Sequence, residues 1–240
     1  MTSVTRIGIL GGTFDPVHTG HVDTALAAHR ALALDRVLVM PSGTPPHRAS
    51  PPAASRFHRF AMAALAVTGL RGLMVSDLEI GHTGPCYTFD TLARVHATGL
   101  GAAQIFFITG ADAFAEIATW SRYPQVLEMA HFVVVSRPGH PATALPVRLP
   151  ELAARMVQPV APASTPDDGP AQAGDVAANR LKVVLVDAPT PDVSSTEVRR
   201  RLAAGESITD LVPTDVETYI GQHGLYSRGD AGARFGKSLA

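Results

Sequence analysis

Short apolar runs recur along the chain, each bounded by glycine, proline or charged residues. The clearest are Ile7–Leu10, Val37–Met40, Ile105–Ile108, Phe132–Val135 and Val183–Val186, and a weaker one is Leu73–Val75. In an extended chain these runs are apolar on both faces, whereas a half-solvated antiparallel strand alternates apolar and polar positions. The pattern predicts buried strands of a parallel sheet that helices cover on each side.

Stretches with helical spacing of apolar residues separate these runs. They are His21–Leu32, Ser55–Val67, Thr88–His96 and Pro124–Met129. In the first, Val22, Ala25 and Leu26 share one face, which leaves Asp23 and Arg30 for solvent. Because strands and helices alternate, the chain is predicted to form a doubly wound, Rossmann-like α/β sheet.

Two more helices are predicted near the C-terminus. Residues 194–197 read Ser-Ser-Thr-Glu, a capping box in which the Ser194 hydroxyl accepts from the third backbone N–H and Glu197 reaches back. A helix is therefore expected from Ser194 to about Ala204, and another over Thr214–His223.

The length of the chain indicates one domain. A chain of 240 residues suits a single α/β domain with decoration, which we place at residues 1–226. The segment from Gly139 to about Asn179 is rich in proline and alanine and poor in aromatic residues. It is interpreted as an insertion, about residues 139–179, that offers little to bury and is mobile or only partly ordered. Residues 227–240 are expected to form a flexible tail.

The charge balance argues against a nucleic-acid partner. Lysine and arginine number 20 against 21 aspartate and glutamate, so the net charge of -1 gives no general field for polyanions. The single cysteine, Cys86, excludes an internal disulfide and a C-x-x-C zinc site. The chain has neither a signal-like start nor an apolar run near the roughly 20 residues that span a bilayer. We therefore predict a cytoplasmic protein without a membrane partner.

The most informative stretch is Gly11–His21, which directly follows the first predicted strand and leads into the first helix. Ligands of doubly wound sheets bind at this carboxyl end of a strand. Gly11 and Gly12 allow a tight turn and a close approach of the backbone to a phosphate. The helix N-terminus adds unpaired N–H groups and the positive end of its dipole, so the loop is predicted to bind an anion.

Two histidines in this loop are candidates for contacting phosphate. His18 and His21 are three residues apart, which places both on one side of the first helical turn, where they can contact one phosphate group together. A zinc site is the competing interpretation, but helical zinc pairs usually sit four apart and no third ligand is visible. The loop also lacks the Gly-Lys-Ser/Thr of a P-loop and the spacing of a G-x-G-x-x-G dinucleotide loop.

The loop resembles the G-G-x-F-D-P-x-H-x-G-H motif of a nucleotidyltransferase superfamily, and every fixed position is present. That superfamily includes nicotinate-nucleotide, nicotinamide-nucleotide and phosphopantetheine adenylyltransferases. A second motif, I-S-S-T-x-x-R, is matched by Val193–Arg199 with valine in the first place. Its capped helix start, spare hydroxyls and arginine form a second anion cradle suited to triphosphate oxygens. The resemblance implies an ATP site made by Gly11, Gly12, Thr13, Phe14, His18, His21, Arg137, Ser194, Ser195, Thr196 and Arg199.

Further stretches resemble the nicotinate branch in particular. They are Pro45–Arg48 (P-P-H-[K/R]), Arg59–Met62 (R-x-x-M), Tyr87–Thr88 (Y-T), Gly110–Asp112 (G-x-D), Thr119–Trp120 (T-W) and Ser136–Gly139 (S-R-P-G). By itself, Arg59 would pass as a solvated helix residue. An aromatic plane over a pyridine ring, with backbone N–H groups toward a carboxylate, suits recognition of nicotinate. The resemblance implies a substrate site made by Asp15, His47, Arg48, Thr88, Asp112 and Trp120.

The implied reaction joins ATP and nicotinate mononucleotide into nicotinate adenine dinucleotide and pyrophosphate, a step of NAD biosynthesis. His18, His21 and Arg199 are the implied catalytic residues, and Mg²⁺ is expected to be bound through the ATP phosphates, with few protein ligands. Phosphopantetheine and nicotinamide-nucleotide adenylyltransferases stay open as alternatives, as does a non-catalytic nucleotide sensor. The insertion could serve in subunit contacts of a homo-oligomer.

Overall fold

The computed structural model describes residues 5–46, 50–159 and 181–227. His47 and Arg48 lie outside the described residues, as do residues 160–179 of the predicted insertion and 228–240 of the predicted tail. In the described part of the chain, no helix is both long enough and apolar enough to cross a membrane. The cytoplasmic location and the outer boundaries of the domain stay predictions.

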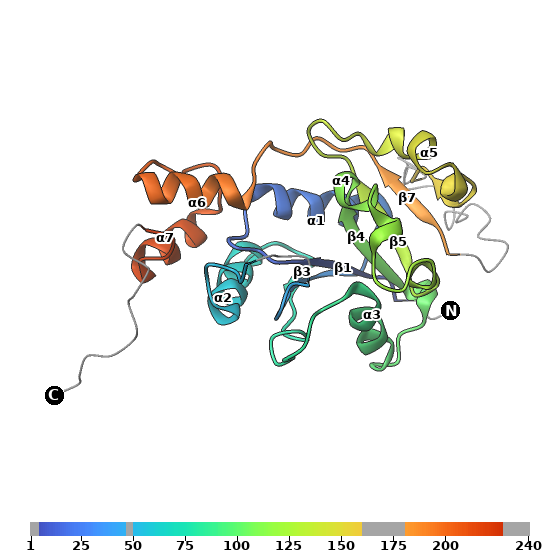
Figure 1. Ribbon diagram of the computed structural model, residues 1–240, viewed down its shortest axis with the longest axis horizontal. Helices are drawn as coiled ribbons and strands as arrows, with labels where there is room; N and C mark the ends of the chain where they lie inside the picture. Colours follow the sequence, from blue (N-terminus) through green and yellow to red (C-terminus); the bar gives the residue numbers. More distant parts are fainter. Residues whose placement is uncertain (1–4, 47–49, 160–180, 228–240) are drawn as a thin grey trace, which may run out of the picture.

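Seven strands form one sheet (Figure 1). They are β1 (Ile7–Gly12), β2 (Arg36–Pro41), β3 (Leu73–Val75), β4 (Ile105–Gly110), β5 (His131–Val135), β6 (Met156–Val157) and β7 (Val183–Val186). Their order is β3-β2-β1-β4-β5-β7-β6, and every neighbouring pair is parallel. The predicted fold class is therefore confirmed, and each predicted strand matches one of β1–β5 and β7.

The helices alternate with these strands. They are α1 (Thr19–Leu32), α2 (Arg56–Val67), α3 (Thr88–His96), α4 (Ala111–Phe114), α5 (Leu145–Arg148), α6 (Ser195–Ala204) and α7 (Thr214–His223). Short 3-10 helices are η1 (Ala102–Gln104), η2 (Ile117–Thr119), η3 (Gln125–Glu128), η4 (Ala142–Ala144) and η5 (Pro150–Arg155). The helix predicted over residues 124–129 is the 3-10 helix η3, whereas the other predicted helices are α-helices as expected.

Each face of the sheet has its own apolar core, because successive strand residues point to opposite faces. Leu10, Val39 and Ile108 pack in one core with side chains of α1, α2, α6 and α7. Ile9 and Phe107 pack in the other with α3, α4, α5 and the short helices. The helices α1 and α2 share a face because the right-handed crossovers β1–β2 and β2–β3 run the same way along the sheet. Figure 1 shows α6 and α7 at one end of the molecule and α5 at the other.

The strand order places a switch point at β1. From β1 the chain moves outward to β2 and β3, then returns to the other side of β1 with β4. The connections that leave the carboxyl ends of β1 and β4 therefore go to opposite faces and leave a crevice between them, which is where such sheets bind ligands. The Gly11–His21 loop begins at the end of β1, so the fold puts it at this crevice.

The predicted insertion is folded in its described half, residues 139–159, which corrects the expectation that it has little to bury. Ala142, Leu145, Leu149 and Leu152 are all buried in the core beneath β5 and β7. Strand β6 then adds the last strand of the sheet beside β7. The spacing of these four apolar residues by three, four and three is a helical stripe. The expectation was based on composition, which is dominated by proline and alanine, and it therefore overlooked this stripe.

Candidate active site

The β1–α1 loop is held by packing against its neighbours. The backbone N–H of Ser42 donates to the Gly12 carbonyl at 2.8 Å, which ties the loop to the end of β2. Phe14 is buried and has a positive φ of 51°. A Cβ on Gly12 would lie 2.8 Å from the Phe14 ring, so this close approach needs glycine. Gly11 is exposed and Thr13 half-buried, so the first part of the loop lies at the surface.

The two histidines stand together at the start of α1. His18 is the N-cap residue, and its ring stacks on that of His21 with centroids 3.6 Å apart. The His18 backbone N–H donates to Nδ1 of His21 at 3.2 Å. A neutral imidazole whose Nδ1 accepts carries its proton on Nε2, so His21 keeps Nε2–H as a donor. Within the described residues, the buried Nδ1 of His18 has no hydrogen-bond partner.

Both rings are neutral at physiological pH. Burial, and then the positive charge of Arg137, lower the pKa of His18 from 6.5 to about 3. Burial lowers the pKa of His21 well below 6.5, with smaller contributions from His18 and Arg137. Desolvation disfavours the charged form of a histidine, and a nearby cation adds to that effect. The pair therefore offers hydrogen-bond donors to an anion, while the positive charge comes from neighbouring arginines.

Arg137 brings one of those charges from the end of β5. Its Nη2 donates to the Val193 carbonyl at 3.3 Å, just before α6, and its positive charge contributes to the lowered pKa of both histidines. A Cβ on Gly110 would lie 2.8 Å from the Arg137 side chain and 2.4 Å from Oδ1 of Asp112. Glycine at the end of β4 thus leaves room for the arginine to cross toward the β1–α1 loop.

The start of α6 contacts the same loop. The Ser195 hydroxyl donates to the Pro16 carbonyl at 2.8 Å. Nη1 of Arg199 donates to the Asp15 carbonyl at 2.6 Å, and its Nη2 donates to the Thr196 hydroxyl at 3.3 Å. The structure therefore brings the two phosphate motifs predicted from sequence together, although about 180 residues of chain separate them.

The capping box at this helix is only half formed. The Ser194 hydroxyl accepts from the Glu197 backbone N–H at 3.1 Å, as predicted. The Glu197 side chain does not reach back, which corrects the expectation; it binds the guanidinium groups of Arg200 and Arg201 at 2.8 and 2.9 Å. Two arginines within one helical turn compete successfully for that carboxylate.

Asp15 is held inside the protein by several partners. It is 1% exposed. Its carboxyl oxygens accept from the backbone N–H groups of Ala53 and Ala54 at 2.8 and 3.0 Å and from the Tyr226 hydroxyl at 2.9 Å. Nη1 of Arg199 lies 3.9 Å from Oδ2 of Asp15. A buried carboxyl group with this many partners holds the loop in place, and the substrate contact of Asp15 stays a prediction.

Two of the segments predicted to bind nicotinate, around Thr88 and around Trp120, contact each other. Thr88 is half-buried at the first position of α3. The Cys86 backbone N–H donates to the Thr44 carbonyl at 3.0 Å, which joins the start of this helix to the loop that follows β2. The Arg122 guanidinium lies 4.6 Å from the Phe89 ring centroid, which joins α3 to the segment around Trp120. The structure thus brings the Thr88 and Trp120 regions together.

Trp120 and Asp112 follow β4 on this side. The Trp120 ring is half-exposed and meets Phe107 and Phe132 in T-shaped contacts at 6.0 and 6.3 Å. One part of the indole is therefore held by the core while another part is open to a ligand. Asp112 is exposed in the first turn of α4. Since His47 and Arg48 are outside the described residues, their contacts with the substrate stay predictions.

Arg59 is a residue of this region that was undervalued from the sequence. It is 1% exposed, which corrects its interpretation as a solvated residue. Nη1 donates to the Thr13 carbonyl at 2.7 Å and Nη2 to the Gly43 carbonyl at 3.2 Å. One side chain therefore connects the β1–α1 loop with the loop that follows β2. A signal was available, because Arg59 lies three residues before the buried Met62 on α2 and so shares its inward face.

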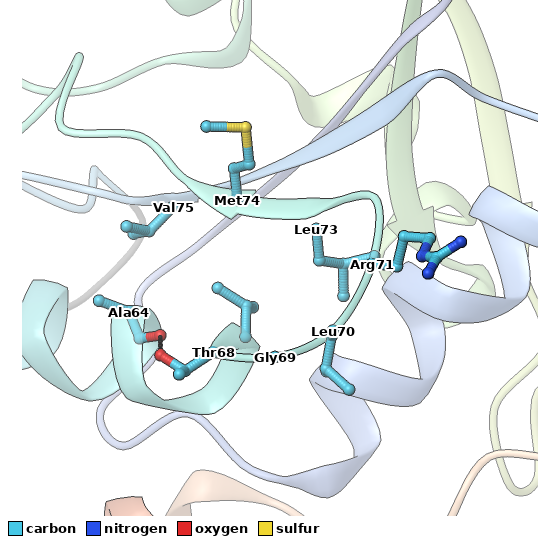
Figure 2. A pocket seen from close by; sticks show the side chains of 9 residues that line it. Ala64, Thr68, Gly69, Leu70, Arg71, Leu73, Met74 and Val75 are labelled. Atoms are coloured by element: carbon cyan, nitrogen blue, oxygen red, sulfur yellow. Dashed lines mark hydrogen bonds between the residues drawn. The ribbon is translucent and has the colours of Figure 1, made fainter.

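The surface has a hollow beside the candidate site and another away from it. One, of about 410 Å³, lies beside Arg137 between the ends of β5 and β7 and is lined in part by Ser136, Asp187 and Thr190. The other, of about 510 Å³, is an apolar groove between α2 and β3 (Figure 2). No motif residue lines the second groove. Its lining includes residues 68–71, which lead into the amino end of β3, whereas ligands of such sheets bind at the carboxyl ends of the strands. The first hollow is therefore the one that belongs to the candidate site.

Comparisons with known proteins identify the family of the chain. A family model described as cytidylyltransferase-like matches residues 9–201, which together with the fold defines a nucleotidyltransferase. Proteins named "probable nicotinate-nucleotide adenylyltransferase" are 38% identical over 92% of this chain in Desulfatibacillum aliphaticivorans and 40% identical over 92% in Roseiflexus sp.. Their own lengths are covered to 99% and 97%. The chain belongs to the nicotinate-nucleotide adenylyltransferase family.

Solved structures show the same fold. A Plasmodium falciparum nicotinic acid mononucleotide adenylyltransferase complexed with NaAD aligns with a TM-score of 0.67 at 18% identity, covering 92% of this chain and 97% of that one. A Vibrio parahaemolyticus protein described as a putative nicotinate-nucleotide adenylyltransferase aligns with a TM-score of 0.54 at 19% identity, covering 92% and 95%. At these identities the likeness establishes the fold alone.

Proposed function

We propose that this enzyme transfers the adenylyl group of ATP to nicotinate mononucleotide, giving nicotinate adenine dinucleotide and pyrophosphate. The observation that carries the proposal is the meeting of His18, His21, Arg137 and Arg199 around the β1–α1 loop at the switch point of the sheet. Membership of the nicotinate-nucleotide adenylyltransferase family supports the choice of acceptor.

The chemistry needs alignment and charge neutralisation more than proton transfer. An oxygen of the mononucleotide 5′-phosphate attacks the α-phosphorus of ATP, and the bond from that phosphorus to the oxygen bridging to the β-phosphate breaks. The attacking phosphate is already an anion at neutral pH, so no general base is required. Negative charge moves onto the leaving pyrophosphate, where fixed donors and cations stabilise the transition state.

Each group of the site has a role in that scheme. His21, through Nε2–H, and His18 donate to the ATP phosphates as neutral rings. Arg137, bonded to the segment before α6, and Arg199, bonded to the loop, supply positive charge. The Ser195 and Thr196 hydroxyls lie beside Arg199 and complete the β- and γ-phosphate end.

Magnesium enters this proposal as part of the substrate, the MgATP complex. Among the residues that the structure describes, no group of three or more His, Cys, Asp or Glu side chains could hold a metal ion. Mg²⁺ commonly keeps several waters and binds through substrate phosphates with few protein ligands, which fits this donor set. Turnover is expected to stop when a chelator removes Mg²⁺ and to return when the ion is added back.

The deciding experiment measures pyrophosphate release from ATP with three acceptors side by side: nicotinate mononucleotide, nicotinamide mononucleotide and phosphopantetheine. We expect the highest kcat/KM with nicotinate mononucleotide, and mass spectrometry should identify nicotinate adenine dinucleotide as the product. Faster turnover of phosphopantetheine would refute the acceptor, and ATP binding without turnover of any acceptor would indicate a nucleotide sensor.

A further inference from the structure

The chain segment after α7 turns back into the core beside the β1–α1 loop. Gly224 adopts a left-handed conformation with φ of 60°. Its N–H donates to the Gly221 carbonyl, and the Leu225 N–H donates to the Ile220 carbonyl at 3.1 Å. This is the Schellman arrangement that ends a helix and reverses the chain, with glycine at its left-handed position. Leu225 and Tyr226 are consequently buried, at 8% and 7% exposed.

Tyr226 ends this turn with a hydrogen bond to a distant part of the chain. Its hydroxyl donates to Oδ1 of Asp15 at 2.9 Å, across 211 positions of sequence. Burial, followed by the negative charge of Asp15, raises the pKa of Tyr226 far above its usual value of 10, so the hydroxyl keeps its proton. Tyr226 itself has a φ of 66°, a costly conformation for a residue with a Cβ, which indicates that its surroundings hold it in place.

Asp15 receives this bond in the middle of the phosphate loop. Its carboxyl group also accepts from the backbone N–H groups that precede α2, so two segments far apart in sequence donate to one side chain. The carbonyl of the same residue accepts from Nη1 of Arg199 at 2.6 Å, and the next carbonyl accepts from the Ser195 hydroxyl at 2.8 Å. Any shift of residue 15 is therefore passed to the anion-binding start of α6.

We propose that Tyr226 is a positioning residue for ATP: through Asp15 it sets the place of the Arg199 guanidinium and thereby the affinity for the triphosphate. The Arg199 side chain is 22% exposed, and its guanidinium donates to the loop and to its own helix. Removing the Tyr226 hydroxyl takes away one of the donors to Oδ1 of Asp15, which keeps the Ala54 backbone N–H, and loosens the peptide that anchors Arg199. This inference rests on the proposed function.

The test compares Tyr226→Phe with Tyr219→Phe. Tyr219 lies on α7, and its hydroxyl bonds to Nδ1 of His58 at 2.9 Å. The control Tyr219→Phe therefore also loses one hydrogen bond, but one that does not involve the phosphate loop. In Tyr226→Phe we expect the MgATP dissociation constant to rise about fivefold or more, as is typical for residues coupled in one hydrogen-bond network. Calorimetry without acceptor measures this constant. The KM for nicotinate mononucleotide should stay within about twofold of the parent. In Tyr219→Phe both quantities should match the parent.

A double variant tests the route through Arg199. If Tyr226 acts through that guanidinium, then Tyr226→Phe added to Arg199→Ala should leave the MgATP dissociation constant at the value of Arg199→Ala alone. Thermal unfolding midpoints, measured beside binding, confirm that every variant is folded at the assay temperature. Because Tyr→Phe removes one oxygen atom and keeps the ring, packing of Tyr226 is retained.

The outcomes separate this inference from the proposed function. Unchanged MgATP affinity in Tyr226→Phe, or an equal change in Tyr219→Phe, would overturn the positioning role even if the parent makes nicotinate adenine dinucleotide. Additive effects of Tyr226→Phe and Arg199→Ala would overturn it too. If the parent binds MgATP but turns over no mononucleotide, the proposed function fails, and the binding measurements still decide the role of Tyr226.

Discussion

His18 and His21 combine burial, stacking and a fixed tautomer within four residues of chain. Their rings lie 3.6 Å apart, and the His18 backbone N–H occupies Nδ1 of His21. Burial and Arg137 keep both rings neutral. A neutral donor can be desolvated at modest cost, whereas a buried imidazolium cannot. At this scale the site separates hydrogen bonding, which the histidines supply, from charge, which the arginines supply.

Replacing His21 tests this division. His21→Ala removes one preorganised donor to the ATP phosphates, and loss of such a donor typically lowers kcat by about 100- to 1,000-fold. Steady-state kinetics with ATP and nicotinate mononucleotide measure the effect. His29→Ala, in the last turn of the same helix, is the control and should keep kcat within about twofold of the parent. A kcat close to the parent value in His21→Ala would remove this ring from the chemistry.

The elements between β5 and β7 show how short helices can build a core. Along α5, η5 and the residue between them, the buried side chains Leu145, Leu149 and Leu152 recur at helical spacing. Arg155, 7% exposed, then donates to the Leu127 and Leu181 carbonyls and so connects this segment to the chain before and after it. The described half of the predicted insertion is thus a part of the folded domain.

A pair of substitutions in α5 measures that contribution. Leu145 is 1% exposed and Val147 is 86% exposed. Leu145→Ala is expected to lower the free energy of unfolding by about 2–4 kcal/mol, since it removes buried methyl groups and leaves a cavity. Val147→Ala should change it by less than about 0.5 kcal/mol. Denaturant titration of both variants checks this, and equal stabilities would mean that residues 139–159 are not packed on the sheet.

At the scale of the whole molecule, the parallel sheet gathers distant segments at one edge. The loop after β1, the ends of β4 and β5 and the start of α6 all meet at the carboxyl edge. Tyr226, in the turn that follows α7, bonds to the loop after β1. Burial of ionisable groups at this edge makes the stability of the whole domain depend on pH.

The direction of that dependence follows from His18. The ordinary pKa of histidine is 6.5, and that of His18 in the folded chain is about 3. Between pH 6.5 and pH 3 the unfolded chain therefore binds more protons than the folded one. The stability of the parent should therefore fall as the pH is lowered through this window, by at most about 1.4 kcal/mol per pH unit for this one group. Above the upper end of the window the contribution is constant.

His18→Asn isolates this term, because asparagine is a good N-cap residue and does not titrate. Urea titrations of parent and variant at several pH values give the two slopes. We expect the variant to lose less stability than the parent between pH 6.5 and pH 3. Identical slopes would show that the folded chain protonates His18 as readily as the unfolded one.

Much of the fold and of the phosphate site could be predicted from the sequence, because the determinants are local. Strand and helix periods are read within a few residues, and they gave all but β6 of the sheet. The glycines and histidines of the first loop carry their chemistry within eleven positions. The capped start of α6 is similarly local, since Ser194 and the N–H that it accepts from are three residues apart.

What only the tertiary structure decided involves partners far apart in sequence. Asp15 is predicted as a substrate ligand from its motif, and contacts 38 to 211 residues away also make it the buried anchor of the loop. Arg59 reads as solvated, yet carbonyls of two other loops enclose it. The neutrality of the histidines depends on burial and on Arg137, more than 100 positions later. Local sequence sets the conformations that a segment can adopt, whereas burial and charge at a site are set by what the fold places around it.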